Sequence, residues 1–290
     1  PGLRSYLQGF DPEVEDDRFN QQMSTNFPGF LDKGSNTAGL KSEYDFGPVG
    51  GIEDFKLTWI NGYSRIFIDA EPDADQSPAD LLRLHVASEH HQITSEPRFS
   101  GALPDGLFGL GQRLEFVAGG FFFSGKFGQI TDLSAARDLA TYLATDSGIR
   151  QISGNAQLGA LLQLGGLGPL NPILAPILSG AIGEDSFNLD FRQKSTTQAV
   201  FGQMIWKLSD RWTLIPGARY SSENKKVRAI GVANCRAPPA CLTQAAVSGQ
   251  PYDQSSDRTE TDFSPKLALQ FGLTPDVNLF ASYALGYKSG

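Results

Sequence analysis

Two runs of alternating residues, joined by a tight turn, occupy residues 263–290, FSPKLALQFGLTPDVNLFASYALGYKSG. In the first run, Phe263, Leu267 and Leu269 alternate with polar or small residues such as Lys266. The second run alternates in the same way after the turn. Period-two alternation is typical of a β-strand with one apolar and one polar face. The stretch therefore predicts an antiparallel hairpin.

The same alternation recurs along the chain and predicts eight strands. Their expected ranges are 38–47, 53–69, 84–100, 113–125, 187–208, 211–228, 257–272 and 277–290. Several are longer than the five or six residues usual in soluble proteins. Tight or moderate connections alternate with long ones, which run over residues 70–83, 125–185 and 225–257. The strands are thus expected to run up and down, with all short turns at one end.

This layout predicts an all-β, antiparallel transmembrane β-barrel with long extracellular loops, apolar side chains outside and polar side chains inside. Residues Phe116 to Phe123 are apolar at both odd and even positions, so the sequence does not show which face of strand 113–125 points outward. A soluble β-sandwich or solenoid also alternates and remains the alternative. Aromatic residues opposite rows of Lys, Arg and Glu favour the barrel, because lipid lies outside it and water or a plug inside.

Composition excludes other classes of protein. The chain has 290 residues, 19% charged residues, 32 Gly, 20 Phe and a net charge of -8. A nucleic-acid partner is not expected, because binding phosphates needs a positive surface.

One short helix is predicted at Asp132 to Ala144. Residues 151–183 carry no charge, but their Gly and Pro residues favour an irregular apolar loop over a membrane helix.

Several motifs resemble one family. The segments FSPK, NLFASYA and GYKSG lie at the end of the chain, and LSDRWTL and PGARY lie in the hairpin before it. They resemble the barrel of TonB-dependent outer-membrane receptors. The resemblance implies a barrel of about 22 strands, of which this chain supplies about eight. It also implies an outer-membrane location in a Gram-negative bacterium, with outer-membrane lipid around the barrel.

The leading hypothesis is energy-coupled uptake of a bulky ligand, such as a ferric siderophore, with no catalysis. The resemblance implies that the TonB-ExbB-ExbD complex acts through a plug domain that this chain lacks. The expected organisation is an extracellular loop segment at 1–37 and a partial barrel at 38–290, with a long loop insertion at 126–186. Pro1 to Asp17 shows no secretory signal, so we expect an internal piece of a longer protein. A passive porin, a surface-adhesion barrel or a soluble glycan-binding module are the alternatives.

Candidate site residues are few. Cys235 and Cys241 flank a Pro-Pro turn in a long loop, which favours a disulfide over two free thiols. The polar row of the strands is expected to face a plug or a hydrated lumen. Its candidates are Arg98, Lys207, Arg219, Lys266 and Lys288. Pro97, which lacks an N–H, predicts a bulge or a local break in its strand.

Two further clusters are interpreted as structural, and no cofactor or metal site is predicted. His85 and His91 are expected on one strand face and His90 on the other, without a haem or metal role. An acidic loop has the alternate spacing of a calcium loop but lacks its turn glycine, so a solvated loop is preferred. Its carboxylates are Asp69, Glu71, Asp73, Asp75 and Asp80. Phosphate-binding, zinc-protease and serine-hydrolase motifs are absent from the sequence.

Overall fold

The computed structural model describes residues 3–13, 19, 23–143, 185–234 and 251–286. Eight strands form one antiparallel sheet in which each strand pairs with the next along the chain. They are β1 (Phe30–Val49), β2 (Ile52–Glu71), β3 (Leu82–Leu103), β4 (Arg113–Ala135), β5 (Ser186–Lys207), β6 (Trp212–Asn234), β7 (Tyr252–Thr274) and β8 (Val277–Ala284). The expected number and order of the strands are thus confirmed.

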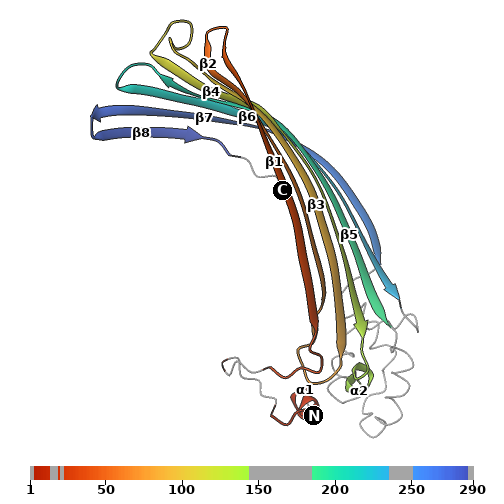
Figure 1. Cartoon of the computed structure of the whole chain (residues 1–290). Helices are drawn as coiled ribbons and strands as arrows, with labels where there is room; N and C mark the ends of the chain where they lie inside the picture. The colour runs from red at the N-terminus through yellow and green to blue at the C-terminus, as the bar shows by residue number, and fades with distance from the viewer. Residues whose placement is uncertain (1–2, 14–18, 20–22, 144–184, 235–250, 287–290) are drawn as a thin grey trace.

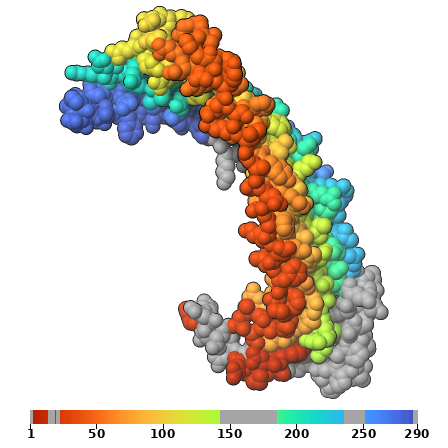
Figure 2. Space-filling model, viewed as in Figure 1, coloured from red at the N-terminus to blue at the C-terminus, as the bar shows by residue number. Residues whose placement is uncertain are grey.

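The sheet is long, open and bent. In Figure 1 the strands run side by side and curve together, and the space-filling view in Figure 2 shows the same bend around a hollow side. Strands β1 to β7 have 20 to 23 residues. A membrane strand needs only about 9 to 11 residues. Each of these strands is therefore long enough to cross a bilayer and continue well beyond it.

Strand ends differ from the sequence expectation. β1 begins at Phe30, so residues 30–37 belong to a strand and not to the predicted loop segment 1–37. β4 continues to Ala135, so the loop predicted at 126–186 starts later than expected. The backbone ladder explains both extensions, since pairs such as Leu31 with Ala70 continue it. Side-chain alternation fades there, whereas hydrogen bonding between the strands does not depend on it.

The predicted helix at Asp132 to Ala144 is wrong in its first half. Asp132 pairs with Asn188 and Leu133 with Phe187 in the β4–β5 ladder. The helix α2 covers only Leu139–Leu143. Pairing with a neighbouring strand satisfies the backbone at Asp132 to Ala135 and outweighs the helical spacing of the side chains. No helix in the described part of the chain is long and apolar enough to span a membrane.

Pro97 interrupts its ladder as expected. The β3–β4 pairs run to Ser95 with Phe122 and resume at Arg98 with Gly119, without a change of register. The missing N–H of Pro97 therefore produces a local break and not a bulge.

A small core closes the end of the sheet that carries the long connections. Ala79, Leu81, Ala140 and Tyr142 are buried there. The helix α1 (Leu3–Leu7) brings the Tyr6 ring to 5.3 Å from the Tyr142 ring. Burial, reinforced by the Asp138 carboxylate, raises the pKa of Tyr6 to about 12.

Candidate functional site

The register divides the sheet into two faces, because directly paired residues project to the same side. Arg98 pairs with Gly119, Gly119 with Phe201, and Phe201 with Arg219. Lys266 pairs with Gly217, two residues from Arg219. We call the side of these residues the polar face and the opposite side the belt face.

The belt face carries a band of exposed apolar side chains in the half of the sheet near the short turns. Its large exposed residues include Leu40, Tyr44, Trp59, Tyr63, Ile93, Phe99, Val200, Met204, Trp212, Tyr220, Phe263, Leu267, Leu269, Leu279 and Tyr283. Val200 and Phe263 are 62% and 60% exposed. A continuous exposed band of this kind is expected where hydrocarbon, and not water, surrounds a barrel.

The polar face brings together four of the five predicted candidates. Arg98, Lys207, Arg219 and Lys266 lie on it, and Lys288 lies outside the described residues. Arg98 forms an ion pair with Glu96 on the same strand face. The pair is about half exposed on its Arg side, so its contribution to stability is expected to be small.

Arg219 has a different environment, made of aromatic rings. Its guanidinium carbon lies 5.1 Å from the centre of the Phe121 ring and 5.9 Å from that of Phe201. Its Nε donates a hydrogen bond of 3.0 Å to the Ser221 hydroxyl. Cation–π contacts at these distances are favourable and fix the planar group against the rings. Arg219 thus presents an oriented cation on the polar face.

The facing of strand 113–125, open in the sequence, follows from the register. Phe121 and Phe123 share the polar face with Gly119, whereas Phe122 lies on the belt face. Further along the polar face, the Phe127 ring lies 6.0 Å from the Phe191 ring. We call this set the aromatic strip: Phe121, Phe123, Phe127, Phe191 and Phe201. Sequence reasoning missed it, although the odd-numbered Phe residues of β4 were its signal.

The three histidines divide between the faces as expected from their spacing. His90 lies on the polar face, with its ring 6.4 Å from that of Phe127. His85 Nε2 lies 2.7 Å from an Asp69 carboxylate oxygen, and His91 Nε2 lies 3.1 Å from Glu89. In the described ranges, no group of three or more His, Cys, Asp or Glu side chains is placed to hold a metal ion.

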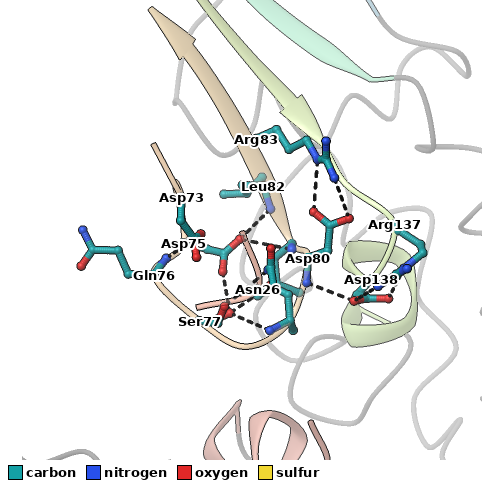
Figure 3. Close-up of polar contacts among 12 residues, drawn as sticks. Asn26, Asp73, Asp75, Gln76, Ser77, Asp80, Leu82, Arg83, Arg137 and Asp138 are labelled. Carbon is teal, nitrogen blue, oxygen red and sulfur yellow. Dashed lines mark hydrogen bonds and ion pairs between the residues drawn. The ribbon is translucent and has the colours of Figure 1, made fainter. Parts of the chain in front are cut away.

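The structure places Asp69 and Glu71 in β2 and not in the predicted acidic loop, because the β1–β2 ladder continues to Glu71. The other carboxylates of that loop, between β2 and β3, make internal contacts (Figure 3). Asp75 accepts hydrogen bonds from the backbone N–H groups of Leu81 and Leu82, at 3.1 and 2.9 Å. Asp80 pairs with Arg83 at 3.3 Å. Asp75 therefore acts as a local cap that orders the start of β3.

The predicted disulfide, between Cys235 and Cys241, lies outside the described residues. So does most of the segment between β4 and β5. The described candidate site is therefore the polar face with its aromatic strip.

Comparison with known proteins shows a match to one family model. The family model described as TonB dependent receptor-like, beta-barrel matches residues 3–290. No curated protein matches the chain.

Two solved structures are similar in fold. The ferric yersiniabactin uptake receptor FyuA from Yersinia pestis has a TM-score of 0.54 and 11% identity, over 88% of this chain and 28% of that one. The siderophore receptor PiuA from Acinetobacter baumannii has a TM-score of 0.52 and 12% identity, over 90% of this chain and 33% of that one. The chain thus spans about a third of the length of these receptors.

Proposed function

The chain belongs to the TonB-dependent receptor-like β-barrel family, and from that premise we propose that it forms part of the wall of an energy-coupled outer-membrane transporter. The family resemblance and the all-β antiparallel fold expected from the sequence are both confirmed. Barrels of this family are outer-membrane proteins of Gram-negative bacteria, and the family consists of receptors, not enzymes.

In this proposal the belt face contacts lipid and the polar face lines the interior. The support is the exposed apolar band on one side of the sheet and the charged row on the other. An open sheet leaves two unpaired strand edges, which lipid does not tolerate. The remaining strands of a longer chain would pair with β1 and β8 and close the barrel.

We propose a ferric siderophore-type complex as the ligand. One of the similar solved structures is named as a ferric yersiniabactin uptake receptor and the other as a siderophore receptor. The observation in this chain that supports the proposal is the aromatic strip with Arg219 held over Phe121 and Phe201. Aromatic faces can stack on the flat groups of an organic chelator, and the cation can attract an anionic complex. The TonB-ExbB-ExbD complex would supply the energy through a plug elsewhere in the receptor.

Uptake of radioactive iron tests this function. The full-length receptor is expressed in a Gram-negative strain that lacks other iron receptors, and a panel of ferric siderophores is supplied. We expect uptake of at least one complex, abolished by an uncoupler of the inner-membrane proton gradient. Uptake that continues unchanged with the uncoupler would instead support a passive porin.

Two neighbouring phenylalanines provide a matched pair of variants for the ligand site. Phe121→Leu removes an aromatic face from the polar side of β4, and Phe122→Leu makes the same change on the belt side. We expect Phe121→Leu to weaken ligand binding about fivefold, since a stacked aromatic contributes about 1 kcal/mol beyond its area. Equal ligand affinity of the two variants would show that the aromatic strip does not contact the ligand.

A further inference from the structure

The connection between β3 and β4, residues 104–112, carries an apolar tip. Phe108 is 92% exposed and Leu110 is 63% exposed, although both are large apolar residues. The other short connections at this end of the sheet have small or polar residues at their tips, among them Gly50, Asp210 and Asp276. Neighbouring exposed apolar side chains on one turn mark a candidate contact site.

The backbone holds Phe108 in a conformation that a bulky side chain does not favour. Leu107 and Leu110 exchange two backbone hydrogen bonds, of 3.2 and 3.0 Å, so Phe108 and Gly109 form a two-residue hairpin turn. Both central residues have positive φ, 55° and 77°, as in a type I′ turn. Asn, Asp or Gly is favoured at the first of these positions, whereas a bulky residue is an outlier there. The turn itself therefore gives no reason for a Phe at this position.

The turn lies against the belt face, where Trp206 holds it. Trp206 is two positions from the belt residue Met204, so the period of two places it on the same face. Its indole Nε1 donates a hydrogen bond of 3.0 Å to the Leu110 carbonyl oxygen. A Cβ atom added at Gly106 would lie 3.2 Å from this nitrogen, and one added at Gly111 would lie 2.7 Å from it. The glycines thus allow the backbone of the turn to pack closely against the indole.

Aromatic side chains of the belt face place the turn at the level of a membrane surface. On the strand next to Trp206, the Trp212 ring lies 4.5 Å from the Phe271 ring. Trp is enriched where hydrocarbon meets the lipid headgroups, because its ring is apolar and its N–H is polar. In Figure 2 the turn, in yellow, lies on the outer side of the bend. Since the turn is bonded to Trp206, it lies at the headgroup level beside the belt face.

Polar groups at the base of the turn pair with one another. Arg113, the first residue of β4, forms ion pairs with Glu53 and Glu115, at 3.2 and 3.1 Å. The Gln112 side chain donates a hydrogen bond of 2.7 Å to the Asp210 carboxylate. The turn therefore has a polar base and an apolar tip, a combination that suits the boundary between water and hydrocarbon.

We propose that the tip of this turn, Phe108 with Leu110, inserts into the periplasmic leaflet of the outer membrane and anchors this end of the barrel wall. The inference rests on the proposed membrane-spanning barrel, in which short turns face the periplasm. Continuity with the belt face supports lipid as the occupant, because the turn and the belt face meet at Trp206. Burial of the Phe108 ring in lipid also offsets its unfavourable backbone conformation.

Spin labels on the full-length receptor in phosphatidylcholine vesicles test the anchor. A nitroxide is attached at Phe108→Cys or at Leu110→Cys, in a receptor that also carries Cys235→Ser and Cys241→Ser. The collision rate of the label with oxygen, which dissolves in hydrocarbon, is compared with its collision rate with a water-soluble nickel complex. The matched control is Asp276→Cys, in the exposed turn between β7 and β8 at the same end of the sheet.

We expect the labels at positions 108 and 110 to lose most of the nickel collisions measured at position 276, because a polar complex is excluded from hydrocarbon. Their oxygen collisions should be more frequent. Two positions are labelled so that one reading remains if the other variant does not assemble. A label at position 108 that meets the nickel complex as often as the control would overturn the proposal. So would an immobile label shielded from both reagents, which would show contact with a protein surface instead of lipid.

A label within the apolar band separates this proposal from the proposed function. Val200 lies on the belt face, so a nitroxide at Val200→Cys should be exposed to lipid. A label at position 200 that meets the nickel complex freely would refute the membrane-spanning barrel itself. A lipid-exposed label at position 200 together with a water-exposed label at position 108 would refute only the anchor.

Discussion

Gly119 is predicted to be essential for the close approach of β3 and β4 beside Pro97. A Cβ atom at position 119 would lie 2.5 Å from the Pro97 carbonyl oxygen and 2.8 Å from the tip of the Phe201 ring. An ordinary contact needs at least about 3.4 Å. Gly119→Ala must therefore shift the β3 backbone and the Phe201 ring by roughly 0.5 to 1 Å.

Overpacking of this kind typically costs about 1 to 3 kcal/mol. The neighbours of this Cβ position include backbone atoms of Pro97 and Arg98, which cannot turn away as a flexible side chain can. The displaced Phe201 ring would also disturb its contact with Arg219, 5.9 Å away. We therefore expect Gly119→Ala to lower both the stability of the barrel and the affinity for ligand.

The control is Gly128→Ala on the same strand, where a new Cβ meets nothing within 4 Å. Urea unfolding of the full-length receptor in lipid vesicles measures both variants. We expect the midpoint for Gly119→Ala to fall by on the order of 1 M, given a slope of about 1 to 3 kcal/mol per M. The midpoint for Gly128→Ala should change little, with a free-energy effect within about 0.5 kcal/mol. Indistinguishable midpoints would refute the close-approach argument.

Three other predictions follow from the two faces and the loops. In vesicles of brominated lipid, a full-length receptor whose sole tryptophan is Trp59 should lose fluorescence. A receptor whose sole tryptophan comes from Phe121→Trp should keep its fluorescence. Equal quenching of the two would contradict the assignment of the faces. Cys235 and Cys241 should react with a thiol reagent only after reduction, and reaction without a reductant would show free thiols. Tyr6 should ionise near pH 12, detected as the tyrosinate absorbance that Tyr6→Phe removes. Because its pKa in the folded protein is raised, the packing of α1 should be stable below about pH 10 and weaken as the pH rises toward 12.

Local patterns in the sequence were sufficient for the strands and for the family. Alternation and turn residues are properties of neighbouring positions, so they predicted eight strands and the break at Pro97. They were less successful at strand ends, where residues 30–37 and 126–135 lack clear alternation but continue the ladder. The helical spacing at Asp132 to Ala144 predicted a helix where strand pairing forms in its first half. Pairing with a distant strand leaves no local pattern in the sequence.

A period of two sets which residues of one strand share a face, so the order of the amino acids is enough to predict long amphipathic strands with a charged row that includes Arg98 and Arg219. Which residues of different strands meet is a property of the folded sheet. The register places Phe121 and Phe201 around Arg219, and it brings Trp206 to the turn at Leu110. Register depends on hydrogen bonds between strands far apart in the chain, so the aromatic strip and the contact between Trp206 and the turn exist only once the sheet has formed.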